Sequence, residues 1–266
     1  MIETARAAFR RLHEAGTFVM PNPWDVPSAR LLEHLGFPAL ATTSSGFAAS
    51  LGRADQRVTR DELVAHVATL TAAVAVPVSV DAERGYAADP AGVAETVRML
   101  AEAGASGVSI EDYDPVTGRI DPVGVAAERI AAAAGVCARH GMVLTGRAEN
   151  HLYGIGDLRD TIDRLAAYRD AGAACLYAPG LADLGEITGV VREIGTAVNV
   201  LALRHGPSVA QLASAGVRRV STGGSLAWAA YGALVDAATE LRDSGTSGYL
   251  DRALSRPMRD SAFRSE

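Results

Sequence analysis

Three carboxylates in the middle of the sequence follow the ends of short apolar runs. Asp81 and Glu83 come directly after the run PVSV, and Glu111 directly after the run GVSI. Residues two apart share one face of an extended chain. Carboxylates that converge on one cavity repel each other unless a cation lies among them, and donors that are all oxygen favour Mg²⁺ or Mn²⁺. The pattern predicts a metal site made of Asp81, Glu83 and Glu111.

Groups that bind anions stand at the ends of two further apolar runs. Arg147 follows the run MVLT, and its planar guanidinium can bind a carboxylate or an enolate oxygen through two hydrogen bonds. The turn predicted at Ser44, Ser45 and Gly46 offers hydroxyl and backbone N–H groups to a second anionic end. A single carboxylate at a strand end is often only a helix cap or an ion-pair partner. Three of them on neighbouring strands beside an arginine favour a binding site.

The chain contains no lysine, so all 25 residues counted as Lys or Arg are arginines. Schiff-base chemistry and phosphate binding by a P-loop both need a lysine amine and are excluded. The Gly223-Gly224 pair after the last apolar run suggests a phosphate cradle and hence a sugar-phosphate isomerase or aldolase. This alternative leaves the acidic cluster unexplained.

Composition places further bounds on the function. The net charge of −6 argues against a nucleic-acid partner, which would need a surface rich in basic residues. No apolar run approaches the roughly 20 residues that a membrane-spanning helix needs. The first 16 residues read as an amphipathic helix without the features of a signal peptide, so a cytoplasmic protein is expected. Cys137 and Cys175 stand in apolar surroundings and are expected to be inert buried thiols.

Short apolar runs alternate with longer amphipathic segments along the chain, as expected for parallel strands buried on both faces and helices between them. Several helical segments end in glycine just before the next run. Eight such units in 266 residues predict a single (β/α)8 TIM barrel over residues 1–266. The expected strands are 17–20, 39–43, 77–81, 107–111, 142–147, 174–178, 197–201 and 217–221. Catalytic residues of a barrel lie at the carboxyl ends of its strands, which is where the acidic residues and Arg147 fall.

The same motifs resemble the isocitrate lyase / phosphoenolpyruvate mutase superfamily. The similarity begins at Pro21-Asn22-Pro23-Trp24-Asp25 and continues through the motifs around Ser45, Asp81, Glu111 and Arg147. It implies a Mg²⁺-dependent enzyme that acts on a small 2-oxo acid through an enolate.

By position, the resemblance implies roles for the following residues. Ser45, Gly46 and Phe47 would hold the substrate carboxylate, and Ser44 of the same turn is added to this binding group. Asp81, Glu83 and Glu111 would hold the metal directly or through water, and Asp55 would be a further polar residue near it. Arg147 would bind the substrate and stabilise the oxyanion. Glu111, Asp55 and Arg147 form the expected catalytic group. The resemblance also implies a homo-oligomer, a tetramer or dimer, in which the Ala-rich helix after Ser225 packs on a neighbouring subunit.

The loop after the fourth strand departs from the superfamily pattern. Isocitrate lyases carry a Lys-Lys-Cys-Gly-His loop there, whereas residues 111–119 of this chain contain no Cys, Lys or His. We therefore expect a lyase or decarboxylase for an oxaloacetate-like acid that works through a metal-stabilised enolate, with solvent able to supply the proton. A P–C bond enzyme of the phosphoenolpyruvate mutase or phosphonopyruvate hydrolase type, and a barrel that binds 2-oxo acids without turnover, remain as alternatives.

Overall fold

A computed structural model describes residues 2–263, and eight parallel strands form its centre. The strands are β1 (Phe18–Met20), β2 (Leu40–Ala41), β3 (Val78–Asp81), β4 (Gly107–Glu111), β7 (Val143–Arg147), β8 (Cys175–Tyr177), β9 (Ala197–Leu201) and β10 (Arg219–Ser221). They lie in the order β1-β10-β9-β8-β7-β4-β3-β2. The backbone N–H of Ala41 donates to the carbonyl of Pro21 at 3.1 Å and so joins the two end strands. The predicted (β/α)8 barrel is confirmed.

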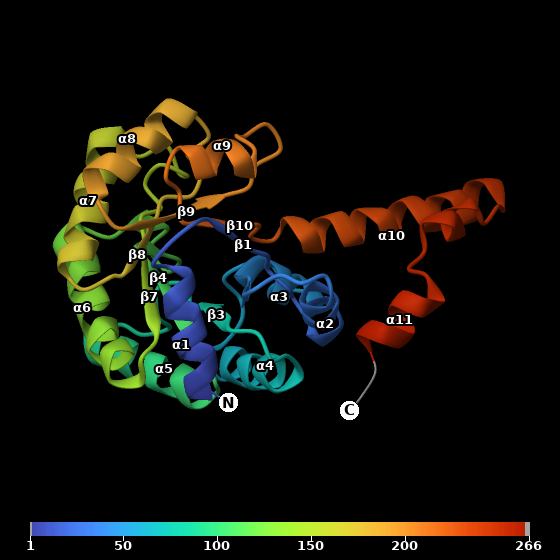
Figure 1. Ribbon diagram of the computed structural model, residues 1–266, viewed down its shortest axis with the longest axis horizontal. Coiled ribbons are helices and arrows are strands. Elements are labelled where there is room, and N and C mark those ends of the chain that lie inside the picture. The colour runs from blue at the N-terminus through green and yellow to red at the C-terminus, as the bar shows by residue number, and fades with distance from the viewer. Residues whose placement is uncertain (1, 264–266) are drawn as a thin grey trace.

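Helices follow the strands and surround the barrel (Figure 1). They are α1 (Ile2–Leu12), α2 (Val26–His34), α3 (Ser44–Ser50), α4 (Arg60–Ala73), α5 (Pro90–Glu102), α6 (Val123–His140), α7 (Leu158–Asp170), α8 (Leu184–Ile194), α9 (Val209–Ser214), α10 (Ser225–Ser244), the 3-10 helix η1 (Gly248–Arg252) and α11 (Arg256–Ala262). The expected glycines that end helices have positive φ, for example 98° at Gly104 and 106° at Gly172, a conformation that favours glycine.

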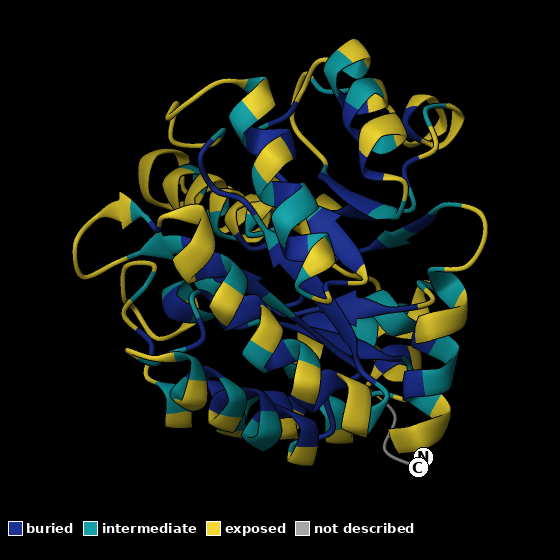
Figure 2. Cartoon of the chain, turned by 90° about the vertical axis from the view of Figure 1, so that its left-hand side faces the viewer, coloured by how far each residue is buried: buried dark blue, intermediate teal, exposed yellow. Residues whose placement is uncertain are grey.

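The main core lies between the outer face of the barrel and the helices, and most residues of the barrel strands are buried (Figure 2). Val80, Val108 and Leu144 of successive strands are at most 2% exposed and belong to this core. Because side chains alternate along a strand, the neighbours of these residues point into the barrel. Asp81, Ser109 and Arg147 are among the residues that line the interior cavity at the end of the barrel.

Two elements around the site differ from the sequence expectation. The predicted turn at Ser44–Gly46 is the first turn of helix α3, because the side chain of Thr43 accepts a hydrogen bond from the N–H of Gly46 and caps the helix. The loop after β4 contains a small hairpin of β5 (Tyr113–Asp114) and β6 (Arg119–Ile120). Arg84 binds Asp121 at the base of this hairpin with two hydrogen bonds of 2.7 and 2.9 Å.

Helix α10 leaves the barrel as an arm, and α11 turns back from its far end (Figure 1). Among the 20 residues of α10, Ala227 is the buried one. Within residues 2–263, no helix has the length and apolar character needed to cross a membrane.

Candidate active site

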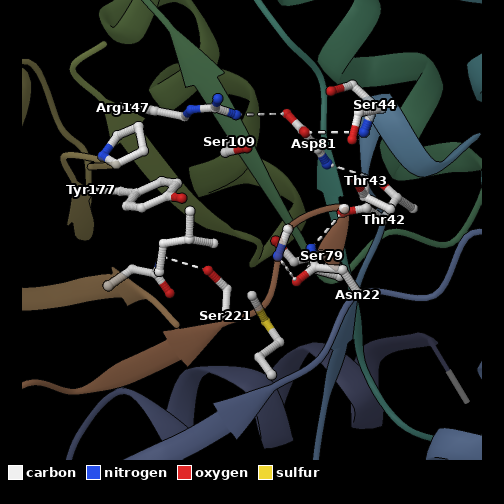
Figure 3. Close-up of a pocket in the computed structure, with 18 of the residues that line it drawn as sticks. Asn22, Thr42, Thr43, Ser44, Ser79, Asp81, Ser109, Arg147, Tyr177 and Ser221 are labelled. Carbon is white, nitrogen blue, oxygen red and sulfur yellow. Dashed lines mark hydrogen bonds and ion pairs between the residues drawn. The ribbon is translucent and has the colours of Figure 1, made fainter. Parts of the chain in front are cut away.

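A cavity of about 170 Å³ opens at the carboxyl ends of the barrel strands. Figure 3 shows Asn22, Ser44, Asp81, Arg147 and Ser221 arranged around it. These side chains come from different strands and from the loops that follow them, as expected for the catalytic face of a barrel. The cavity brings the predicted anion-binding residues Ser44, Ser45 and Arg147 together with Asp55 and Asp81.

Arg147, at the end of β7, occupies the centre of the charged groups. Its Nη1 lies 3.0 Å from Glu111 Oε2 and 3.3 Å from Asp81 Oδ1, and its Nε bonds Glu149. Its Cζ lies 5.5 Å from the ring centroid of Tyr177. This packing and the three carboxylates fix the guanidinium plane at the cavity wall, and the carboxylates hold the pKa of Arg147 well above its ordinary value against the effect of burial.

Asp81 and Asp55 are the two acidic residues that line the cavity. The N–H of Ser44, in the first turn of α3, donates to Asp81 Oδ2 at 3.2 Å, and the hydroxyl of Thr42 accepts from the N–H of Asp81 at 2.9 Å. Burial, followed by the charge of Asp81, raises the pKa of Asp55. Two carboxylates therefore share this edge of the cavity and raise the energy of a negative charge there.

Glu83 and Glu111 lie behind the cavity wall. Tyr86 donates to Glu83 Oε1 at 2.7 Å, and Gln56 donates to Glu111 Oε1 at 3.0 Å. Burial raises the pKa of Glu83 to about 7 and that of Glu111 well above its ordinary value, although Tyr86 and Arg147, respectively, act in the opposite direction. Among residues 2–263, no three His, Cys, Asp or Glu side chains are placed to hold a metal ion directly. A metal bound directly by Asp81, Glu83 and Glu111 together is thus not what the structure presents.

Backbone strain is concentrated around the same acidic groups. Among the described residues, Gln56, Glu83 and Tyr86 are the non-glycine residues with positive φ, at 64°, 47° and 55°. Each of them is a partner in the hydrogen bonds to Glu83 or Glu111 just described. Strained backbone that is held in place by its surroundings is typical of functional sites.

A buried network supports Arg147 from behind. Asp112 accepts hydrogen bonds from the N–H of Glu149 at 2.8 Å and from the hydroxyl of Tyr168 at 2.6 Å, and Arg164 Nη1 lies 3.2 Å from it. Glu149 in turn binds Arg147. Asp112 therefore holds Glu149, and Glu149 holds Arg147, so both act as positioning residues.

Two predicted substrate-binding residues lie away from the cavity. The ring of Phe47 stacks on His66, with centroids 3.7 Å apart, and lines a separate hollow between α2 and α4. Gly46 packs where a Cβ would be 2.6 Å from Thr43 Cγ2, and its N–H is used by the helix cap. Ser44 and Ser45 do line the cavity, as expected.

Several cavity residues were not predicted. Asn22 joins three strand ends: its Nδ2 donates to the carbonyl of Thr42 at 2.7 Å, and its Oδ1 accepts from the N–H groups of Thr222 and Gly223 at 2.9 Å each. The Gly223-Gly224 turn, which suggested a phosphate cradle, thus already has the N–H of Gly223 bonded within the protein. Further polar residues that line the cavity and were not predicted include Ser79, Ser109, Tyr177, Asn199, Arg219 and Ser221. Side chains two residues apart in a strand point to the same side. Ser79 and Ser109 could therefore have been predicted to face the cavity, because each lies two residues before a predicted carboxylate.

Comparison with known proteins places this site in a family. The phosphoenolpyruvate phosphomutase family model matches residues 9–242. An uncharacterized protein of Mycobacterium tuberculosis is 38% identical over 220 residues, which are 81% of each chain. An oxaloacetate decarboxylase of Rhodopseudomonas palustris is 33% identical over 185 residues, 66% of this chain and 63% of the decarboxylase.

Solved structures agree with this assignment. A Burkholderia cenocepacia J2315 protein, described provisionally as a lyase/mutase, has 47% identity and a TM-score of 0.95, covering 99% of this chain and 97% of its own. A 2,3-dimethylmalate lyase has 26% identity and a TM-score of 0.83, covering 98% and 93%. A 2-methylisocitrate lyase of Aeropyrum pernix is 30% identical over 185 residues, 66% of this chain and 58% of the lyase. The chain therefore belongs to the phosphoenolpyruvate phosphomutase family, within the phosphoenolpyruvate mutase / isocitrate lyase superfamily.

Proposed function

We propose that this protein is a Mg²⁺-dependent lyase or decarboxylase that acts on a small, oxaloacetate-like 2-oxo acid through an enolate. The observation that carries the proposal is the position of Arg147, whose guanidinium lines the cavity beside Asp81. A fixed guanidinium can stabilise the negative charge that develops on an enolate oxygen. The 33% identity to an oxaloacetate decarboxylase supports this class of substrate.

The residues around the cavity fit a hard divalent cation. Asp55, Asp81, Glu83, Glu111 and Glu149 lie around one guanidinium, so the cluster carries more acidic groups than Arg147 can neutralise. Their donor atoms are all oxygen, which suits Mg²⁺ or Mn²⁺. Asp81 would hold the ion directly, and Glu83 and Glu111 would do so through water. When bound, the ion would polarise the 2-oxo group and neutralise negative charge.

The side chains of the chain itself have distinct tasks in this reaction. Ser44 and Ser45, which line the cavity at the start of α3, bind the substrate carboxylate through their hydroxyl groups. In decarboxylation the bond between the β-carbon and the leaving carboxylate breaks, its electron pair forms the enolate, and CO₂ departs. Arg147 donates to the enolate oxygen. Solvent then delivers a proton to the β-carbon, since the hairpin β5–β6 carries no Cys, Lys or His to do so.

The test is a substrate panel with purified protein and Mg²⁺. Oxaloacetate, 2-methylisocitrate and phosphonopyruvate are supplied separately, and pyruvate release is measured with lactate dehydrogenase and NADH. We expect Mg²⁺-dependent pyruvate release from oxaloacetate at a rate above that with Mg²⁺ alone, and its loss with EDTA. Pyruvate release from phosphonopyruvate and from neither of the other two acids would reject this proposal and identify an enzyme that cleaves P–C bonds. Tight binding of these acids with none of them consumed would identify a non-catalytic binder.

Removing the carboxylate of Asp81 should abolish metal binding. For Asp81→Asn we expect Mn²⁺ affinity in the presence of oxalate to fall at least about 100-fold, because loss of outer-shell partners alone typically costs 10–100-fold. Mn²⁺ binding is followed by electron paramagnetic resonance of the free ion. Asp61→Asn is the control, since the Asp61 side chain is 83% exposed on α4. Equal Mn²⁺ affinity of the two variants would reject Asp81 as a ligand.

The position of Ser45 can be tested through the glycine beside it. A Cβ on Gly224 would overlap Ser45 Oγ and approach Trp228 Nε1 to 3.2 Å, so Gly224→Ala should push the serine hydroxyl out of place. We expect KM to rise about 3- to 10-fold, as for one lost hydrogen bond. Gly232→Ala in the same helix is the control, because its Cβ would meet no atom within 4 Å. Unchanged KM in Gly224→Ala would argue against Ser45 as a substrate ligand.

We also propose that the exposed apolar face of α10 packs on a second copy of the chain. The face consists of Trp228, Leu234, Val235 and Leu241, which are 51–64% exposed. An apolar stripe of this kind on a projecting helix is typical of an interface. Light scattering after size-exclusion chromatography should give a dimer or tetramer for the wild type and a monomer for Leu234→Asp/Val235→Asp. A wild-type monomer at 50 µM would reject this interface.

A further inference from the structure

The interior of this barrel is polar below the proposed active site. Barrel interiors are normally filled by layers of bulky apolar side chains. Here Ser79 and Ser109 lie two residues before Asp81 and Glu111, and Thr145 lies two residues before Arg147. Asn199 and Arg219 extend this polar layer on β9 and β10, and both also line the cavity that holds Arg147. The cavity therefore continues from the strand ends into the barrel.

Arg219 is the cation of this layer and lacks an anionic partner. It is 2% exposed. Its Nε donates to Asn199 Oδ1 at 2.9 Å, its Nη2 donates to Thr145 Oγ1 at 2.9 Å, and its Nη1 lies 3.2 Å from His13 Nε2. Within residues 2–263, no Asp or Glu oxygen lies within 4.0 Å of its guanidinium nitrogens. Arg147, in contrast, has three such partners.

His13 cannot serve as the missing counter-charge. Its Nδ1 lies 2.8 Å from the carbonyl of Phe9, which can only accept, so Nδ1 carries the proton and Nε2 accepts from Arg219. Burial, followed by the charge of Arg219, lowers the pKa of His13 to about 3. The histidine is therefore neutral near pH 7, and no side chain of the described residues 2–263 forms an ion pair with Arg219.

A buried charge without a partner is unfavourable unless something neutralises it. The guanidinium has five N–H groups, and the three contacts above use three of them. Within residues 2–263 the other two have no protein partner, and Arg219 lines the cavity. A ligand that reaches Arg219 would satisfy both the free N–H groups and the charge.

We propose that the inner end of the cavity is an anion subsite built on Arg219. Its ligand is a small anion, either the distal carboxylate of a dianionic substrate or a free inorganic ion. The first case rests on the proposed function and narrows its substrates to diacids, with one acidic end at Ser44 and Ser45 and the other at Arg219. The second case is independent of the reaction.

The test compares two ligands that differ by one carboxylate. The ligands are 3,3-difluorooxaloacetate and 3,3-difluoro-2-oxobutanoate, which share the 2-oxo acid end and differ in that the second has a methyl group in place of the distal carboxylate. Isothermal titration calorimetry in the presence of Mg²⁺ gives the dissociation constant of each ligand and hence their ratio. We expect the diacid to bind about 10- to 100-fold tighter to the wild type, as for a charge-assisted hydrogen bond. Arg219→Met should reduce this ratio to near one. The same titrations in sodium chloride and in sodium gluconate at equal ionic strength show whether a free anion competes.

Asn199→Asp keeps the proposal testable if Arg219→Met does not fold. The aspartate would keep the acceptor for Arg219 and place a carboxylate where the amide now lies. We expect it to remove the preference for the diacid and to raise the melting temperature. Arg6→Met is the matched control, because Arg6 is 7% exposed and bound to the carbonyls of Ala101 and Ala105 outside the cavity. It should lower stability and leave the ratio unchanged.

The outcomes separate this inference from the proposed function. Loss of the diacid preference in Arg219→Met and Asn199→Asp assigns the subsite to the substrate. Competition by chloride in the wild type but not in these variants assigns it to an inorganic ion. A ratio unchanged in both variants, together with no chloride effect, overturns the subsite, and the substrate panel can still show pyruvate release in that case.

Discussion

Arg147→Ala should lower kcat for the 2-oxo acid by about 10²–10³-fold, the usual cost of removing a donor that stabilises an oxyanion. The guanidinium lines the cavity and is held by Asp81, Glu111 and Glu149, so it is already oriented before substrate binds. Its removal takes away the donor and leaves three carboxylates to repel one another. Steady-state kinetics with the substrate that the panel identifies would measure the effect.

Arg147→Lys separates geometry from charge. A lysine keeps the positive charge but lacks the planar fork that spans Glu111 and Glu149, so we expect kcat to stay well below the wild-type value. Arg98→Ala is the control, since Arg98 is 43% exposed on α5 and pairs with Glu95 and Glu102 on the same helix. If Arg147→Ala keeps wild-type kcat while its melting temperature is also unchanged, Arg147 has no part in catalysis.

The barrel strands could be predicted closely because each is a short apolar run followed by polar residues. The expected strands at 107–111 and 197–201 agree with β4 and β9 to the residue, and the others are shorter in the structure than expected. The hairpin β5–β6 was not predicted, because two-residue strands have no hydrophobic period to detect. It is held by the ion pair of Arg84 with Asp121, which are 37 residues apart.

Part of the candidate site could be predicted from the rule that catalytic residues of a barrel lie at the carboxyl ends of its strands. That rule identified Ser44, Asp81 and Arg147, which lie around one cavity. Phe47 was implied by the family resemblance and not by this rule, and in the structure its ring stacks on His66 away from the cavity, since residues at the start of a helix point in several directions. Arg219 was missed because its environment depends on His13, 206 residues away, and no local spacing records such a contact.

The buried network behind Arg147 is also where a single substitution should cost the most stability. Asp112 is 0% exposed and accepts from the N–H of Glu149, the hydroxyl of Tyr168 and Arg164. In Asp112→Ala these donors lose their acceptor inside the protein. Breaking a buried ion pair by removing one partner typically costs about 3–5 kcal/mol, and we expect a loss of unfolding free energy in that range.

Urea unfolding followed by circular dichroism would measure this loss, and the melting temperature should fall by roughly 10 °C, at 2–4 °C per kcal/mol. Asp163→Ala on α7 is the control, because its pair with Arg159 is exposed to solvent and should contribute little to stability. Asp112→Ala also removes the acceptor for the N–H of Glu149, which holds Arg147. The variant should therefore have a lower kcat at temperatures where it remains folded. Equal stability of the two variants would show that Asp112 is not what holds Glu149 and Arg147 in place.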